Sequence, residues 1–227
     1  YNEGDSRVSA DLTSYMTGLK DPRCESYFTK STFDLPEANG FVGLRSGIQI
    51  PSGKTIKQYS NMKVQSNSKM LWMNAAEVAF LKAEGALRGW TMGATAKQLY
   101  EEGVKLSFEQ HNADGVDTYL ADNTSTPALY KDPVNPAFSY AGTAPTITVK
   151  WDDSADFEVN LERIITQKWI ANFPLGLEAW AEYRRTGYPL LMPVTKNNSG
   201  GVVSSTRGAR RLPYPQRERT DNSENYN

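Results

Sequence analysis

The chain offers few residue patterns that could support catalysis. Residues 60–63 and 66–69 both fit S-x-x-K, the nucleophile pattern of penicillin-recognising enzymes, but the accompanying S-D-N and K-T-G elements are absent from the sequence. A Ser-His-Asp triad or a zinc site would have to be built around His111, the only histidine. Cys24 is the only cysteine, which excludes an internal disulfide. These observations favour a chain without catalytic activity.

An acidic run, formed by Asp152, Asp153, Asp156 and Glu158, is the remaining candidate for chemistry. Its spacing lacks the central glycine of a calcium-binding loop. Its position at the start of an expected helix, at about residues 156–172, favours interaction of negative charge with that helix end. A carboxylate-dependent glycan hydrolase would need two carboxylates facing each other across a cleft, so it is kept only as a less favoured alternative.

Four residues of a long irregular stretch are the predicted ligand contacts. The stretch covers residues 21–69 and is polar and glycine-rich, without sustained helical or strand periodicity. Phe41 and Tyr59 could stack on a sugar, because an aromatic face pairs with the apolar C–H face of a sugar ring. Arg45 and Asn61 could hydrogen-bond the sugar hydroxyls. The alternative for each aromatic residue is that it fills a gap between irregular segments.

Two helix pairs are expected to carry these loops. The first, at about residues 74–111, begins with a capping-box-like spacing of Asn74 and Glu77. Its first helix has only a narrow polar stripe of Glu77, Glu84 and Arg88, which predicts burial on most sides. Its second helix places Ala96, Tyr100 and Gly103 as in the second helix of a tetratricopeptide-type hairpin. One such hairpin cannot bury its own faces, so further helices must stack on it.

The second helix pair is expected at about residues 156–187, where Gly187 and Pro189 end it. Trp72, Trp169 and Trp180 lie on or next to expected helices and are predicted to be buried. Residues 7–19 form another helix candidate, and residues 146–151 alternate as a short strand or extended segment. The tail over residues 193–227 should wrap the surface, held by Leu212 and Tyr214. The fold class is therefore mainly α, with long irregular loops and minor β.

Composition limits the partners that the chain could have. With 227 residues it is long enough for one substantial domain or two small ones. Lys plus Arg number 25 and Asp plus Glu 26, so no overall field attracts nucleic acid or an anionic membrane. The mean hydropathy of -0.57 and the lack of a long apolar run exclude a transmembrane helix. No glycine-rich phosphate loop or Cys/His metal pattern suggests a cofactor. The first residue is Tyr1, so any export signal is expected upstream.

Six stretches, in order, carry a family resemblance. They are Asp21-Pro22-Arg23, residues 43–47, residues 73–84, residues 161–169, residues 178–180 with 184–189, and Arg211-x-Pro213-Tyr214-Pro215 with Glu218. Together they closely resemble the C-terminal half of the SusD/RagB family of nutrient-capturing outer-membrane lipoproteins. One stretch alone would be weak, but six in the family's order are hard to obtain by chance.

The resemblance implies a function and a location. It implies a single SusD-like domain of which residues 1–227 are the C-terminal portion, held at the cell surface by an N-terminal lipid outside this sequence. It also implies binding of a glycan or other nutrient and its delivery to a SusC-like TonB-dependent outer-membrane transporter, without catalysis. A protein-interaction scaffold of tetratricopeptide type stays open as an alternative.

Overall fold

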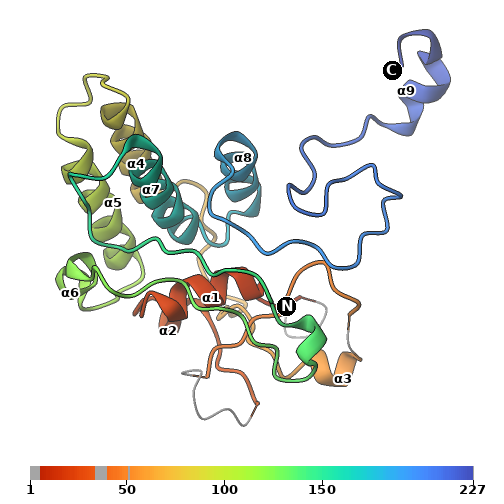
Figure 1. The fold of residues 1–227 in the computed structure, drawn as a ribbon, viewed down its shortest axis with the longest axis horizontal. Helices are drawn as coiled ribbons and strands as arrows, with labels where there is room; N and C mark the ends of the chain where they lie inside the picture. The colour runs from red at the N-terminus through yellow and green to blue at the C-terminus, as the bar shows by residue number, and fades with distance from the viewer. Residues whose placement is uncertain (1–5, 34–39, 51, 227) are drawn as a thin grey trace.

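The computed structural model describes residues 6–33, 40–50 and 52–226, and its regular structure is helical (Figure 1). Its elements are α1 (Ala10–Gly18), α2 (Cys24–Tyr27), α3 (Gly53–Ile56), α4 (Ala75–Leu87), α5 (Ala96–Gln110), α6 (Val116–Ala121), η1 (Pro136–Phe138), α7 (Phe157–Ala171), α8 (Gly176–Thr186), α9 (Gln216–Asp221) and η2 (Ser223–Asn225). Pairing between extended segments in these ranges is limited to isolated bridges. The mainly α fold class is therefore confirmed.

Helices α4, α5 and α7 lie side by side and form a helical layer at one end of the molecule (Figure 1). Gly103 of α5 lets α4 approach, because a Cβ atom there would lie 2.7 Å from the ring of Phe80. Thr95 starts α5 with a full capping box completed by Gln98. Tyr100 is completely buried and donates a hydrogen bond to the carbonyl oxygen of Val149 at 2.6 Å. The hairpin is thus held by small and aromatic residues, as expected from the sequence.

The segment over residues 146–151 is extended but forms no strand. Ile147, Val149 and Trp151 are buried against the helical core. The carbonyl oxygens of this segment accept hydrogen bonds from side chains of α5 and α7, including Arg163 Nε to Thr148 at 3.2 Å. Helix side chains therefore take the place of a neighbouring strand.

The predicted capping box at the start of α4 is wrong. Asn74 does cap the helix by accepting from the amide of Ala76 at 2.9 Å. Glu77 does not reach back to it. Its carboxylate instead pairs with Lys168 at 3.4 Å and accepts from Asn172 Nδ2 at 2.9 Å. Lys168 of α7 therefore binds the Glu77 carboxylate, which the local spacing had predicted to bind the backbone at the helix start.

Of the predicted polar stripe of α4, Arg88 is exposed, but Glu77 and Glu84 face neighbouring helices instead of solvent. Glu84 is buried and forms a paired contact with Arg185 of α8, with both N–O distances 2.6 Å. Lys168 is only 2% exposed and pairs with both Glu77 and Glu182. Ionic contacts thus join α4, α7 and α8, while Val78 and Leu81 lie beside Lys82 on the exposed side of α4.

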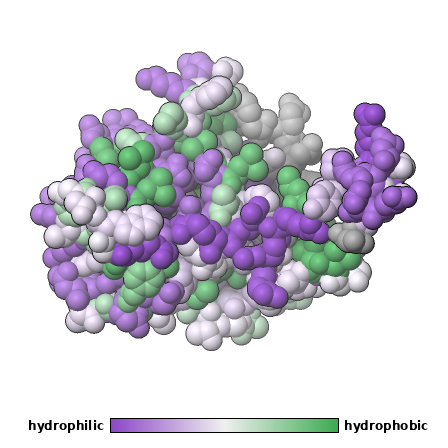
Figure 2. Space-filling model, turned by 90° about the horizontal axis from the view of Figure 1, so that it is seen from above, coloured by the Kyte–Doolittle hydropathy of each residue, from purple (hydrophilic) through white to green (hydrophobic). Residues whose placement is uncertain are grey.

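Several apolar residues in α4 and directly before it are strongly exposed. Trp72 is 83% exposed and Met73 84%, so the expected burial of Trp72 is wrong. Val78 and Leu81 of α4 are 51% and 48% exposed. Figure 2 shows, on one face, apolar groups at the surface among hydrophilic residues.

The C-terminal tail contacts the body at few points and then runs away from it to α9 (Figure 1). Its contacts include Trp180 Nε1 to the carbonyl of Ala209 at 3.1 Å and Tyr183 Oη to that of Thr206 at 3.1 Å. Leu212 is 74% exposed and Tyr214 51%, so neither holds the tail on the body as predicted. Side chains of α8 and, at the start of the tail, the bonds from Thr195 and Lys196 to the carbonyl oxygen of Gly47 make the attachment.

Candidate functional site

The predicted ligand residue Tyr59 is buried inside the irregular half of the chain. Its hydroxyl donates to the carboxylate of Asp132 at 2.9 Å, and the hydroxyl of Tyr130 donates to the same oxygen at 2.8 Å. The other carboxylate oxygen accepts from the amides of Val134 and Asn135. Tyr59 therefore fixes the loop that follows Tyr130.

Arg45, the second predicted residue, is also buried and clamps the same loop. Its guanidinium donates to the carbonyl oxygens of Phe138 and Ser139 at 3.0 and 2.8 Å. It also donates to that of Pro193 at 2.9 Å and lies 5.7 Å from the ring centre of Tyr140. Three carbonyls from two distant segments thus converge on one cation, which a sequence pattern does not reveal.

Asn61 and Phe41 complete the predicted set. Asn61 is half-buried, and its side-chain oxygen accepts from the amide of Met62 at 2.9 Å. Phe41 is 6% exposed and packs edge-on against Phe28. The structure does not gather the four residues around one cavity, and their contact with a ligand stays a prediction. Of the four, Phe41 lines a pocket formed by the described residues.

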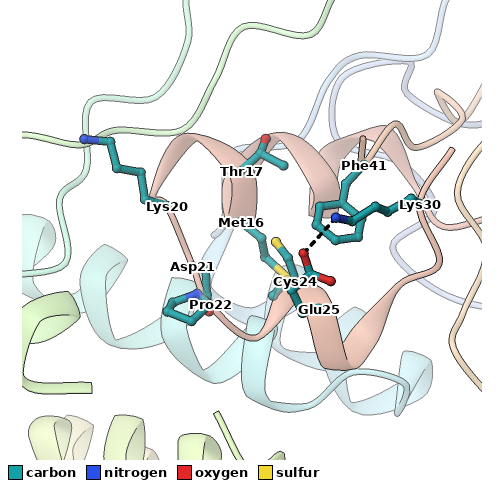
Figure 3. Close-up of a pocket in the computed structure, with 9 residues that line it drawn as sticks. All are labelled: Met16, Thr17, Lys20, Asp21, Pro22, Cys24, Glu25, Lys30 and Phe41. Carbon is teal, nitrogen blue, oxygen red and sulfur yellow. Dashed lines mark ion pairs between the residues drawn. The ribbon is translucent and has the colours of Figure 1, made fainter. Parts of the chain in front are cut away.

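That pocket, here called the α1–α2 pocket, has a volume of about 430 Å³. It lies between the end of α1, the start of α2 and the segment around Phe41 (Figure 3). Its lining consists of Met16, Thr17, Lys20, Asp21, Pro22, Cys24, Glu25, Lys30 and Phe41. The volume falls in the range of small-molecule sites, roughly 300–1,000 Å³.

The α1–α2 pocket has an apolar floor and a charged rim. Met16 and Cys24 are buried lining residues, and Lys30 extends over the ring of Phe41 (Figure 3). Lys30 Nζ lies 3.2 Å from the carboxylate of Glu25. Burial raises the pKa of the Cys24 thiol, so the thiol stays protonated and unreactive at neutral pH. The pocket can therefore bind a partly apolar ligand but offers no nucleophile.

Beneath the pocket, Asp21 and Arg23 form an ion pair in which both side chains are 0% exposed. Burial opposes the charge of the guanidinium, but the Asp21 carboxylate outweighs this effect and raises the pKa of Arg23. Arg23 also donates to Ser107 Oγ at 2.7 Å and to Gln167 Oε1 at 3.0 Å. The Asp21-Pro22-Arg23 stretch thus joins the pocket floor to α5 and α7.

The sequence alone did not reveal this pocket. Its rim residues Lys20 and Glu25 stand in ordinary polar surroundings, and Lys20 follows α1 with a positive φ of 54°. The two helices meet because Arg23 bonds to helices more than 80 positions away in the chain. The nearest local signal is the Asp21-Pro22 turn after α1.

Among the described residues, no group of three or more His, Cys, Asp or Glu side chains could hold a metal ion. None of the helices in this part of the chain is long and apolar enough to cross a bilayer.

Comparison with known proteins agrees with this architecture. A SusD homologue from Bacteroides uniformis is 54% identical with a TM-score of 0.88, over 96% of this chain and 44% of that chain. A chitin-binding SusD homologue from Flavobacterium johnsoniae is 49% identical with a TM-score of 0.87, over 96% of this chain and 45% of that one. A homologue from Bacteroides ovatus is 48% identical with a TM-score of 0.85, over 97% and 47%.

The chain spans less than half the length of these solved structures. Comparison with curated proteins gave no match. The sequence model of the SusD-like family, described as SusD and RagB outer membrane lipoprotein, matches residues 1–227. The chain therefore belongs to the SusD/RagB family of outer-membrane lipoproteins.

Proposed function

We propose that this chain is part of a cell-surface protein that binds a glycan nutrient and delivers it, chemically unchanged, to a SusC-like TonB-dependent transporter. The observation that carries the proposal is the 49% identity with a chitin-binding SusD homologue over nearly the whole chain. The α1–α2 pocket provides a place for the sugar. No step of bond making or breaking is required of the chain.

In this proposal the sugar binds with its apolar face on the pocket floor. Phe41 and Pro22 supply apolar surface, and a sugar ring exposes C–H groups that pack on such surface. Thr17 and the Glu25–Lys30 pair at the rim supply donors and acceptors for hydroxyls. Phe41 keeps its predicted role, but as part of the floor and not as an exposed platform.

Titration calorimetry of the full-length protein against chitin oligosaccharides and other oligosaccharides tests the proposal. Glu25→Trp places a large ring at the pocket rim, and Asp117→Trp is its control, since both are first-turn acidic residues of short helices. We expect Glu25→Trp to weaken glycan binding at least tenfold and Asp117→Trp to leave it unchanged. Equal glycan affinity in both variants would refute sugar binding in the α1–α2 pocket. Absence of binding to every glycan would refute the proposed glycan-binding function.

A protein-interaction scaffold is the second candidate, and one observation favours it. The outward side of α4 exposes Val78 and Leu81 next to Met73 and Trp72, an apolar row suited to contact with another polypeptide. Affinity isolation of the SusC-like transporter by full-length protein separates the two functions. A Leu81→Lys variant that loses the transporter but still binds glycan would assign this row to transporter contact.

No observation of this kind favours the glycan hydrolase alternative. Glu77, Glu84 and Glu182, the carboxylates between α4, α7 and α8, are each paired with a lysine or arginine. A reducing-sugar assay on the full-length protein would overturn this view if turnover were lost on one Asp or Glu substitution.

A further inference from the structure

A second hollow lies beside α1 and is formed by segments far apart in the chain. Its walls come from the first turns of α1, from residues 127–130, from residues 140–145 and from residues 190–193. We call it the Tyr140 groove. Its volume is about 220 Å³, roughly that of seven water molecules in the liquid. This volume is below the roughly 300–1,000 Å³ of typical small-molecule sites, so we expect the groove to hold no more than one small ring-shaped group.

The groove and the α1–α2 pocket lie on opposite sides of α1. The groove uses Asp11, Ser14 and Tyr15, while the pocket uses Met16 and Thr17. At about 100° per residue, the first three cluster on one side of the helix and the other two on the opposite side. The two hollows therefore cannot be parts of one continuous cavity.

The polar chemistry of the groove centres on Asp11. Asp11 lines the groove and is only 7% exposed. One of its carboxylate oxygens accepts a hydrogen bond from the backbone amide of Met192 at 2.7 Å. A carboxylate has about four acceptor sites, so this bond leaves acceptor capacity for a ligand. Burial raises the pKa of Asp11, which shows that its charge is poorly solvated here. Added donors would therefore be favourable.

The rest of the groove is apolar, with small hydroxyl groups at its mouth. Pro127, Pro145 and the half-buried ring of Tyr140 give flat apolar walls, and Thr143 and Thr206 are exposed lining residues. A ligand must therefore present apolar C–H surface together with hydrogen-bond donors. A sugar ring combines both properties, since its hydroxyls project around a C–H face.

We propose that the Tyr140 groove is a second carbohydrate site that binds one neutral sugar residue, with Asp11 accepting hydrogen bonds from its hydroxyl or amide groups. This inference rests on the proposed function. Acidic sugars should bind poorly, because a ligand carboxylate or sulfate beside Asp11 would place two like charges in a poorly solvated space, and the nearby Arg45 cation is already held by three carbonyl oxygens.

The predicted ligand residues Arg45 and Tyr59 acquire a positioning role in this account. Arg45 holds the carbonyl oxygens of Phe138 and Ser139 beside the groove wall and lies against Tyr140. Tyr59 holds Asp132, which fixes the start of the same loop. The wall is therefore set before the ligand arrives, which lowers the entropic cost of binding.

Ligand-observed saturation-transfer NMR on the full-length protein tests the groove, with diacetylchitobiose as the neutral probe and digalacturonate as the acidic probe. The background is Glu25→Trp, in which the α1–α2 pocket is blocked. Thr143→Trp then fills the mouth of the groove. Ala141→Trp is its matched control, because it is an exposed residue of the same loop outside the lining.

We expect the Glu25→Trp protein to keep a diacetylchitobiose signal that is lost on adding Thr143→Trp and kept on adding Ala141→Trp, with no digalacturonate signal. A diacetylchitobiose signal unaffected by Thr143→Trp, or an equal signal from digalacturonate, would refute the proposal that the Tyr140 groove binds a neutral sugar. Loss of all signal in Glu25→Trp alone would overturn the groove and leave the proposed function standing. A wild-type protein silent with every oligosaccharide would overturn both.

Discussion

Replacing Arg23 by methionine should destabilise the protein more than any surface substitution. The side chain is completely buried and donates to Asp21 at 2.9 and 2.6 Å. It also donates to Ser107 of α5 and Gln167 of α7, and its guanidinium carbon lies 4.8 Å from the ring centre of Phe108. One cation therefore connects the start of α2 to two core helices.

The magnitude follows from what the substitution leaves behind. Methionine keeps much of the side-chain volume but leaves the Asp21 carboxylate, whose side chain is 0% exposed, without its cation. Removing one partner of a buried ion pair costs about 3–5 kcal/mol of unfolding free energy. The double variant Asp21→Asn/Arg23→Met removes both charges and should lose less than Arg23→Met alone.

Urea unfolding of the full-length protein, followed by tryptophan fluorescence and circular dichroism, measures both variants. The unfolding free energy of Arg185→Met serves as the comparison, because Arg185 of α8 also forms an ionic contact but its side chain is 42% exposed. A loss below about 1 kcal/mol for Arg23→Met would refute the reasoning, since surface ion pairs are worth about that much. So would a double variant that is less stable than the single one.

Three further predictions concern packing and pH. Gly103→Val should cost about 1–3 kcal/mol of unfolding free energy by overpacking the contact between α4 and α5, whereas Gly176→Val, where a Cβ meets nothing within 4 Å, should cost little. Urea unfolding measures both variants, and equal losses of stability would contradict the close packing at Gly103. Burial lowers the pKa of His111 to about 4 from 6.5, so stability should fall as pH drops from about 6.5 to 4, because the unfolded chain takes up the proton first; His111→Gln should flatten this dependence, and an unchanged pH profile would argue against it. Burial opposes ionisation of Glu84, but the hydrogen bonds from Arg185 lower its pKa, so its stabilising contribution is present above 4.5 and is lost at lower pH; Glu84→Gln should reduce stability at pH 7 with a smaller deficit at pH 3, and a constant deficit would contradict the pairing.

The helices followed from local signals in the sequence. Small and aromatic residues at helical spacing, such as Gly103 and Tyr100, are enough to indicate a helical hairpin, and Gly187 has the left-handed φ of 82° expected after a helix. These signals depend on neighbours within a few positions. Fold class and family could therefore be predicted from the residues and their order.

The direction in which polar side chains point could not be predicted. Glu77 and Glu84 carry charges that suit an exposed stripe, yet they face inward because Lys168 and Arg185 of later helices lie there. Trp72 is exposed although a tryptophan usually adds to a core. Partners from distant segments decide such cases, and spacing along one helix does not contain them.

The candidate site was harder still. Arginine and tyrosine can both bind a sugar, which favours Arg45 and Tyr59 as ligand contacts, but their bonds to Ser139 and Asp132 span more than 70 positions in the chain. Both hollows beside α1 arise where irregular segments meet. Residue type indicates what a side chain can bind, while only the packed chain indicates whether a ligand can reach it.

The most direct test of glycan binding by this chain is a crystal structure of the full-length protein soaked with a neutral chitin oligosaccharide. The account predicts electron density for a sugar against Phe41 in the α1–α2 pocket, with Thr17 or the Glu25–Lys30 pair within hydrogen-bonding distance of its hydroxyls. Sugar density confined to surfaces away from α1, or a fully soaked crystal with both hollows empty, would contradict it.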